Sequence, residues 1–150
     1  MHDTREHEAM LWHAVHGEAA EGSALADTSA KGPYSAPVRC DLCAHRCLIA
    51  EGRRGICQVR ENRGGRLYSL VYGELIAQAV DPIEKKPLFH FLPGSTAFSV
   101  ATAGCNLTCS FCQNADISQG IKDGLALRGR HTTPEEVVAA AARTGCASIA

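Results

Sequence analysis

Seven of the eight cysteines in this 150-residue chain fall into two tight groups, and these groups constrain its fold more than any other feature. The first group comprises Cys40, Cys43, Cys47 and Cys57, and the second comprises Cys105, Cys109 and Cys112. The opening residues lack the apolar segment of a signal peptide, and no apolar run approaches the roughly 20 residues that span a bilayer. We therefore expect a cytoplasmic protein with no membrane partner, whose thiols stay reduced and whose closely spaced cysteines bind metal.

The composition is that of an ordinary globular chain. Apolar residues make up 45% and charged residues 21% of the sequence, close to the averages of soluble domains. The net charge of −1 indicates neither a nucleic-acid partner nor an anionic membrane surface. Arg53, Arg54 and Arg60 surround the first cysteine group, but they lack the broad basic face that a nucleic-acid-binding protein needs.

The first cysteine group has the spacing C-x2-C-x3-C-x9-C and offers four thiolates. A tetrahedral zinc site would stabilise a region with little core of its own, and an auxiliary 4Fe-4S cluster is the alternative. We favour zinc, because two cysteine pairs bridged by a turn with Gly52 and Gly55 resemble a zinc knuckle. We expect His45 to orient a neighbour or to face solvent rather than to bind the metal.

The rest of the N-terminal half predicts a helix, a linker and a β-hairpin. A capping-box spacing and a short apolar stripe predict a helix over residues 3–16, and an Ala-, Gly-, Ser- and Pro-rich stretch over 18–37 indicates a flexible linker. Residues 66–71 and 75–80 predict two strands of a β-hairpin around Gly73. The expected segments are an N-terminal helix and linker (1–37), a four-cysteine metal-binding knuckle (38–62), a β-hairpin with a proline-punctuated connection (63–94), and the start of an α/β domain (95–150).

The last third of the sequence predicts a βαβ unit. Residues 97–103 indicate a buried strand, and a loop of about 25 residues follows, longer than connections usually are without a functional reason. Thr133, Pro134 and Glu136 predict the capped start of a helix. The buried face of this helix should consist of Val137, Val138, Ala141 and Ala142. Gly145 should end the helix. Residues 146–150 then predict a second strand, with Cys146 as a small core residue, and this order implies a parallel sheet or barrel.

The second cysteine group supplies three thiolates within eight positions, directly after the predicted strand. A closed zinc site or an ordinary 4Fe-4S cluster needs four ligands. Three cysteines on one loop can hold three corners of a cubane and leave the fourth iron open for another ligand. The carboxyl end of a strand is also where α/β barrels place their active sites. The alternatives are a zinc site completed by a distant histidine and a chance cluster.

The segment CNLTCSFC resembles the signature of radical S-adenosylmethionine enzymes, C-x3-C-x2-C with an aromatic residue, Phe111, before the last cysteine. The segments CDLCAHRC (40–47), GICQVR (55–60), DPIEKKPLFHFLPG (81–94) and GCNLTCSFCQN (104–114) resemble the radical enzyme of the AmmeMemoRadiSam system, a relative of pyruvate formate-lyase activating enzymes. The chain departs from this group in the length of the linker 18–37 and in Ala44, where proline is common.

The resemblance implies a partial (β/α)6 barrel of which residues 95–150 are the truncated start. We therefore expect the chain to be an N-terminal fragment that does not turn over alone, because a barrel needs all its strands to enclose a cavity. The resemblance also implies that Cys105, Cys109 and Cys112 hold a 4Fe-4S cluster and that Phe111 contacts the adenine of S-adenosylmethionine, largely through its backbone.

The activity implied by the resemblance is that of an oxidoreductase-like enzyme. Reductive cleavage of S-adenosylmethionine gives a 5′-deoxyadenosyl radical, which abstracts hydrogen from a substrate that the sequence does not identify. The expected partners are a flavodoxin- or ferredoxin-like electron donor and Memo-like and AMMECR-like proteins. Lys85, Lys86 and His90 form either a solvated charge cluster or a surface facing an acidic or phosphorylated substrate or partner.

Two alternatives of other kinds stay open. A glycyl-radical enzyme activase would use the same cluster to abstract hydrogen from a partner protein's glycine. A non-enzymatic, metal-stapled binding or electron-transfer module would use its cysteines without S-adenosylmethionine. The open iron separates the radical enzymes from the non-enzymatic module, because only an open iron binds the cofactor.

Overall fold

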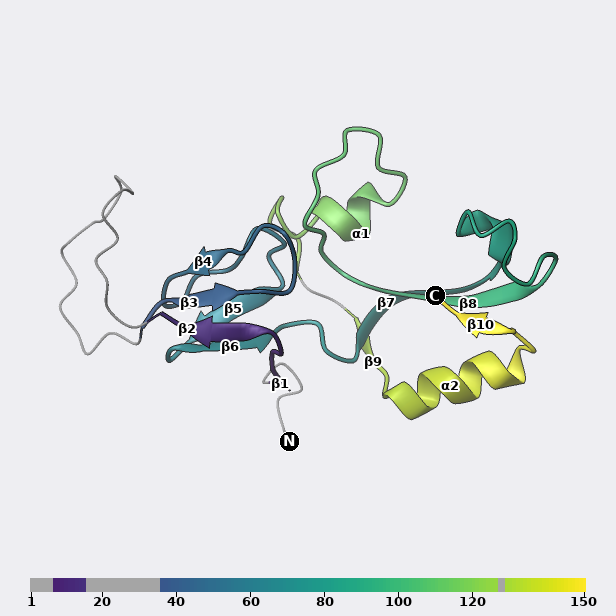
Figure 1. The fold of residues 1–150 in the computed structure, drawn as a ribbon, viewed down its shortest axis with the longest axis horizontal. Helices are drawn as coiled ribbons and strands as arrows, with labels where there is room; N and C mark the ends of the chain where they lie inside the picture. The colour runs from purple at the N-terminus through teal and green to yellow at the C-terminus, as the bar shows by residue number, and fades with distance from the viewer. Residues whose placement is uncertain (1–6, 16–35, 127–128) are drawn as a thin grey trace. The chain divides into compact units, whose positions relative to one another are not determined.

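The structure, a computed structural model, describes residues 7–15, 36–126 and 129–150 (Figure 1). The chain divides into two compact units. The N-terminal unit covers Arg5–Leu70 together with Cys105–Leu107, and the C-terminal unit covers Val71–Gly104 and Thr108–Ala150. No helix within the described ranges is long and apolar enough to cross a bilayer.

The N-terminal unit contains two antiparallel sheets of three strands each. The first sheet, in spatial order, consists of β1 (His7–Glu8), β6 (Arg66–Ser69) and β5 (Arg60–Arg63). The second consists of β2 (Trp12–Ala14), β3 (Val38–Cys40) and β4 (Leu48–Ile49). The core of this unit is formed by Ala9, Val38, Cys40, Ile49 and Leu67, with Trp12 and Cys47 packed against it. Strand alternation turns these side chains inward.

A buried amide links the two sheets of this unit. Asn62 is fully buried, and its side chain donates hydrogen bonds to the carbonyls of Ile49, at 2.9 Å, and Ala36, at 3.3 Å. Its carbonyl oxygen accepts from the N–H of Gly65 at 3.1 Å. Gly64 and Gly65 have φ of 63° and 75°, as a two-residue turn with both central residues left-handed requires. The hairpin β5–β6 is therefore tied to strand β4.

The predicted helix over residues 3–16 is wrong where the structure describes it. His7–Glu8 pairs with β6, and Trp12–Ala14 pairs with β3. Leu11, between them, has φ of 57°, which no right-handed helix allows. A three-residue apolar stripe is a weak helix signal, and pairing with distant strands overrides it. Residues 3–6 and 16, and nearly all of the predicted linker 18–37, lie outside the described residues.

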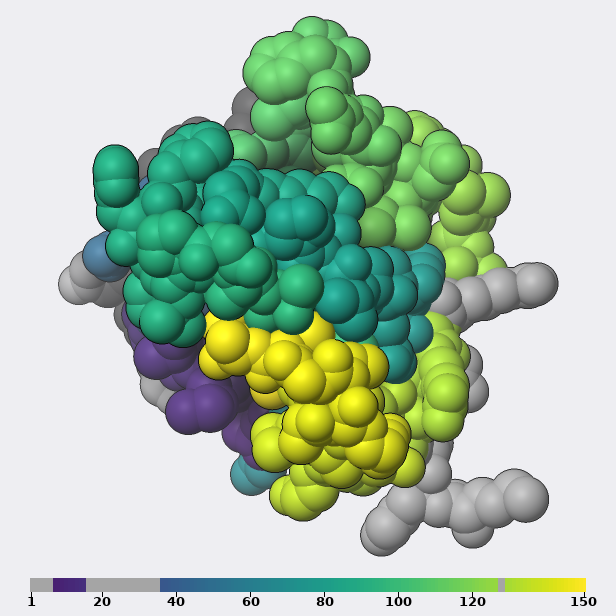
Figure 2. Space-filling model, turned by 90° about the vertical axis from the view of Figure 1, so that its right-hand side faces the viewer, coloured from purple at the N-terminus to yellow at the C-terminus, as the bar shows by residue number. Residues whose placement is uncertain are grey.

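The C-terminal unit contains a mixed sheet in the order β10-β8-β7-β9. Its strands are β7 (Glu74–Pro82), β8 (Thr96–Thr102), β9 (Arg130–His131) and β10 (Ser148–Ile149). The chain runs from β8 through α1 (Ala115–Gln119) and α2 (Pro134–Arg143) to β10, which lies parallel to β8 (Figure 1). In Figure 2 the yellow atoms of this last strand lie directly beside the teal-green atoms of the β7–β8 hairpin.

The expected βαβ connection is thus confirmed, and the fold is α/β with mostly β-structure and few helices among the described residues. The predicted strand 97–103 is present as β8, and Ala97, Phe98 and Ala103 are buried. The predicted loop of about 25 residues contains the short helix α1 and the strand β9. The complete barrel stays a prediction.

The predicted hairpin around Gly73 is wrong, although both of its strands exist. β6 pairs with β1 and β5, whereas β7 pairs with β8 and β9. The proline-punctuated connection 81–94 is the end of the long β7–β8 hairpin and contains a 3-10 turn, η1 (Ile83–Lys85). A glycine between two apolar runs marks a bend, but it does not decide whether the flanking strands pair.

Helix α2 begins as the sequence predicts. The N–H of Glu136 donates to the Thr133 hydroxyl at 3.3 Å, and the Thr133 N–H donates to the Glu136 carboxylate at 2.8 Å. The expected buried face is only partly correct, since Ala141 is buried and Val137 half-buried but Val138 and Ala142 are exposed. The helix contacts the short strand β10, and a two-residue strand covers only a narrow strip of a helix.

Candidate functional site

The second cysteine group follows β8, the strand that leads into it. Ala103 is buried and Gly104 has φ of 90°, a left-handed conformation that turns the chain sharply out of the strand. The Gly104 N–H donates to the Ile117 carbonyl at 2.8 Å, which ties helix α1 to the end of the strand. The predicted placement of the cysteines directly after a strand is confirmed.

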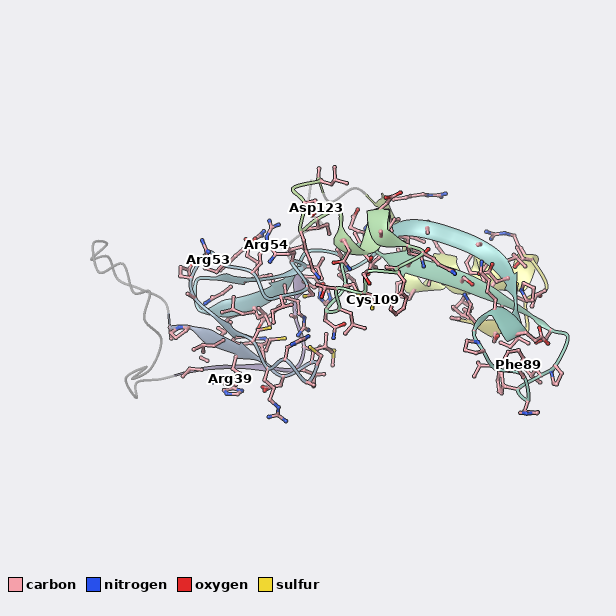
Figure 3. The ribbon with its side chains drawn as sticks, turned by 90° about the horizontal axis from the view of Figure 1, so that it is seen from above. Arg39, Arg53, Arg54, Phe89, Cys109 and Asp123 are labelled. Atoms are coloured by element: carbon pink, nitrogen blue, oxygen red, sulfur yellow. The ribbon has the colours of Figure 1, made fainter. Side chains whose placement is uncertain are left out.

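Cys109 and Cys112 belong to the C-terminal unit. The Cys112 N–H donates to the Cys109 carbonyl at 3.3 Å, so a turn joins the two residues. The Cys112 sulfur lies 3.3 Å from the Ser118 hydroxyl on α1. Cys109 is exposed, and the Phe111 side chain is 85% exposed, so both can meet a ligand from solvent. Figure 3 shows Cys109 on the loop that precedes α1.

Cys105 is half-buried and belongs, with the two residues after it, to the N-terminal unit. The Leu107 N–H donates to the Cys105 sulfur at 3.4 Å. His45, from the first cysteine group, has its Nε2 atom 2.8 Å from the Asn106 carbonyl oxygen. His45 is exposed and also contacts the residue after Cys105, which agrees with the expectation that it orients a neighbour or faces solvent; its role stays a prediction.

The donor set of the second group fits an iron–sulfur cluster in its chemistry. Cys105, Cys109 and Cys112 are free thiols, and soft thiolates are the ligands that such clusters require. Seven residue steps join the first to the last, a span of at most roughly 25 Å even when fully extended. Within the described residues, no three His, Cys, Asp or Glu side chains are already gathered as a metal-binding set. The loop would have to close around the cluster.

The first cysteine group is built into the N-terminal core. Cys40, at the end of β3, is buried, and its N–H donates to the Cys47 carbonyl at 2.9 Å. The Cys43 carbonyl accepts from the Arg46 N–H at 3.1 Å, so residues 43–46 form a turn. A Cβ atom on Gly55 would lie 3.6 Å from the Cys47 sulfur, which shows that the glycine turn lies against this thiol.

Two other thiols of the first group act electrostatically on Cys57, although within the described residues they are not gathered as a metal-binding set. Burial raises the pKa of the Cys57 thiol, and the neighbouring Cys40 and Cys47 thiols raise it further, against a hydrogen bond from the Val59 backbone and the Arg60 charge. Cys43 is half-buried in its turn. A metal ion held by this group would bind its cysteines as thiolates. The choice between zinc and an auxiliary cluster stays a prediction.

Sequence reasoning missed Arg60 as a partner of the first group. Its side chain is buried, and it donates to the Cys40 sulfur at 3.0 Å and to the Met10 carbonyl at 2.6 Å. Its position three residues after Cys57 is the only sequence signal that could have indicated this role. The guanidinium charge acts to lower the pKa of the Cys57 thiol, but burial outweighs it and keeps that pKa above its usual value.

Arg53 and Arg54 lie next to each other at the turn after β4, as Figure 3 shows. They line an open polar hollow of about 460 Å³ together with Gly52, Gln58 and Glu61. Arg54 and Arg63 both pair with the Glu61 carboxylate, at 2.7 and 2.6 Å. Burial acts to raise the pKa of Glu61, but these two hydrogen bonds hold it below its usual value. Much of the positive charge is thus neutralised internally.

Lys85 and Lys86 are held by a carboxylate that sequence reasoning missed. Asp81 is only 8% exposed and accepts from Lys85 at 2.7 Å, Lys86 at 3.1 Å and the Ser99 hydroxyl at 2.6 Å. The hydrogen bond from Lys85, followed by those from Ser99 and Lys86, holds the pKa of Asp81 well below its usual range. The spacing Asp81–Lys85, typical of ion pairs on helical turns, could have indicated this pairing.

The other predicted residues lie apart from these contacts. His90 is exposed on the connection between β7 and β8, in a run whose apolar members Leu88, Phe89, Phe91 and Leu92 are also exposed. Figure 3 shows Phe89 on this connection. Cys146, expected in the core, is only half-buried and accepts a hydrogen bond from the Thr144 hydroxyl at 3.3 Å.

Comparisons with known proteins give two relatives, both from Methanocaldococcus jannaschii. The chain is 49% identical to the uncharacterized protein MJ0808 over 112 residues, which are 75% of this chain and 33% of that protein. It is 36% identical to the uncharacterized protein MJ0674 over 81 residues, which are 53% of this chain and 19% of that protein. No family model and no solved structure matches the chain. The chain thus spans about a third of the length of the relative MJ0808.

Proposed function

We propose that this chain is part of a radical S-adenosylmethionine enzyme of the cytoplasm, similar to the radical enzyme of the AmmeMemoRadiSam system. Cys105, Cys109 and Cys112 would hold a 4Fe-4S cluster whose fourth iron binds the cofactor. The observation that carries the proposal is the C-x3-C-x2-C spacing on a loop that leaves the carboxyl end of β8 through a left-handed glycine. Such a loop end is where α/β enzymes place their chemistry.

When bound, the cluster and S-adenosylmethionine would supply the reductive bond cleavage that yields a carbon radical. The protein's own groups would orient the ligands. The Leu107 N–H and the Ser118 hydroxyl, which lie against the Cys105 and Cys112 sulfurs, would stabilise the thiolates. The exposed Phe111 side chain and its backbone would be available to the adenine.

The four-cysteine group would serve this enzyme as a structural metal site. Cys40, Cys43, Cys47 and Cys57 all belong to the N-terminal unit, and zinc bound by them would stabilise two sheets whose strands have only two to four residues. Lys85 and Lys86 would face an acidic or phosphorylated substrate with the N–H donors that they do not give to Asp81. A flavodoxin- or ferredoxin-like donor and Memo-like and AMMECR-like proteins are the proposed partners.

The test is electron paramagnetic resonance on the anaerobically reconstituted, reduced chain with and without S-adenosylmethionine. Coordination of the cofactor to an open iron should change the spectrum of the reduced cluster. Adenosine, which lacks the amino and carboxylate groups that would chelate the iron, is the matched control for nonspecific nucleoside binding. An identical spectrum with and without S-adenosylmethionine would favour an electron-transfer module, and the absence of any cluster would contradict the proposal.

A further inference from the structure

One peptide group beside Cys105 forms hydrogen bonds through both its carbonyl oxygen and its N–H. The carbonyl oxygen of Asn106 lies 2.8 Å from the Nε2 atom of His45. The N–H of the same peptide group, which belongs to Leu107, donates to the Cys105 sulfur at 3.4 Å. The described peptide bonds are trans, so this carbonyl and N–H point in opposite directions within one plane. The histidine and the thiol therefore lie at opposite edges of a single peptide group.

This arrangement determines which atom of His45 carries a proton. The Asn106 carbonyl can only accept, so Nε2 must be the donor, in either the neutral or the charged ring. A donor at the carbonyl polarises the peptide group and makes its N–H a better donor to the sulfur, because hydrogen bonds in a chain strengthen one another. The His45 ring thus acts on the Cys105 sulfur through one intervening peptide.

His45 itself lies on a turn that three hydrogen bonds hold in place. The Cys43 carbonyl accepts from the Arg46 N–H at 3.1 Å, and the Arg46 carbonyl accepts from the Arg39 guanidinium at 3.1 Å. The Cys47 carbonyl accepts from the Cys40 N–H at 2.9 Å, which fixes the turn to strand β3. Residues Cys105–Leu107 belong to the same compact unit as this turn. The ring is therefore presented by a rigid part of the N-terminal unit.

We propose that His45 is a positioning residue for the cluster: it orients the Asn106–Leu107 peptide toward the Cys105 sulfur and thereby raises the cluster's reduction potential. The inference rests on the proposed function. Reduction adds negative charge to a cluster, and an N–H group bonded to a ligand sulfur stabilises that charge. The first cysteine group would then do more than stabilise the fold, since its turn would adjust how easily the cluster accepts an electron.

The test compares three variants of the whole chain with the parent chain. Each is reconstituted anaerobically and brought to the same fixed solution potential, at which the reduced-to-oxidised ratio of the cluster is measured. His45→Ala removes the donor, and His45→Gln retains an N–H at a similar reach. His13→Ala is the matched control, because His13 is an exposed histidine of the same unit that bonds to the Asp41 carboxylate at 2.8 Å. The reduced-to-oxidised ratio of the cluster should fall about three- to tenfold in His45→Ala, where tenfold equals about 59 mV for one electron. It should be near the parent value in His45→Gln and His13→Ala.

A second measurement, on chain that carries zinc in the first cysteine group but no iron, separates this inference from the proposed function. Hydrogen exchange at the Leu107 amide should become several-fold faster in His45→Ala and stay slow in the other two variants. Unchanged exchange and an unchanged potential in His45→Ala would overturn the role of His45 and leave the cluster assignment intact. Failure of the parent chain to take up iron would overturn the cluster assignment, while faster Leu107 exchange in His45→Ala would still show that the histidine orients this peptide.

Discussion

The two cysteine groups lie in different surroundings, although their spacing is almost equally tight. In the first group Cys40 is part of a core with Val38 and Ile49, and a buried arginine contacts its sulfur. In the second group Cys109 is exposed on a loop whose aromatic residue, Phe111, is 85% exposed. Thiols within a core indicate a closed site that stabilises structure, whereas thiols on an open loop leave room for an exogenous ligand.

The largest expected effect concerns the second cysteine group. Replacing Cys105, Cys109 or Cys112 by Ala should abolish reconstitution of the cluster, because each change removes the only protein ligand of one iron. Iron analysis and the visible absorption of the reconstituted chain measure this. Cys146→Ala, a thiol outside both groups, is the control and should retain the cluster. Normal iron uptake by Cys105→Ala would refute the assignment of the open site.

The second expected effect concerns the first cysteine group. Anaerobically purified protein should carry about one zinc and about four irons per chain, and Cys40→Ala or Cys43→Ala should lose the zinc but not the irons. Loss of the metal should also unfold the N-terminal unit, since binding of structural zinc is coupled to folding. Metal analysis and hydrogen exchange of β3 and β5 are the measurements. A metal content of about eight irons without zinc would make the first group an auxiliary cluster.

Two substitutions of apolar residues by alanine test the difference in burial between the two regions. Leu67 is 0% exposed, and Leu67→Ala should lower the free energy of unfolding by about 2–5 kcal/mol, because it leaves a cavity in the core. Phe111→Ala should change that free energy by less than about 0.5 kcal/mol, because the ring is exposed. Denaturant titration of the zinc-loaded, iron-free chain measures both. A similar cost for the two variants would contradict the contrast between the two regions.

The smallest expected effect is a pH dependence in the unit that carries Cys109 and Cys112. The pKa of Asp81 is held below its ordinary value by Lys85, Ser99 and Lys86. The carboxylate therefore stabilises the folded state at pH values above its unfolded pKa of about 3.9, and this contribution is lost as the pH falls toward the lower folded pKa. Asp81→Asn should remove this part of the acid sensitivity, as denaturation between neutral and acid pH would show.

Glu84→Gln is the comparison variant for that measurement, because it removes a carboxylate that a backbone N–H rather than a lysine stabilises. Glu84 lies on the same 3-10 turn as Lys85, and its carboxylate accepts from the Gly94 N–H at 2.8 Å rather than from a lysine. This backbone hydrogen bond lowers the pKa of Glu84, so its replacement should also alter acid sensitivity while the Asp81 contacts stay in place. Identical acid sensitivity of Asp81→Asn and the parent chain would show that the lysines do not stabilise the fold through Asp81.

Local features of the site and fold were predictable from sequence. The capping box of Thr133 and Glu136 involves residues three apart, and it forms as expected. The strand leading into Cys105 was predicted from the mainly apolar segment 97–103, and the βαβ order was predicted from the helix and strand signals that follow it in the sequence. These predictions succeed because the groups that interact are close in the chain, so that few alternatives compete.

Contacts between distant residues were not predictable in the same way. His7–Glu8 lies in a stretch that predicts a helix, but it becomes a strand because β6, about 60 residues away, offers an edge. The strands around Gly73 exist, yet each pairs with a different partner. Asp81 reaches Ser99 only across the β7–β8 hairpin. Pairing of this kind depends on which edges are free in the folded chain, and no periodicity records it.

The sequence by itself therefore determined the two sets of thiols, their spacing, the capped helix α2 and the strand that carries the open group. Only the tertiary structure decided that Cys40 lies in a core and Cys109 on an exposed loop, because burial depends on strands brought together from distant parts of the chain. It also decided that His45 meets the Asn106 carbonyl, 61 residues further along. A hydrogen bond needs its two atoms in place, and only the packing of the N-terminal unit places them.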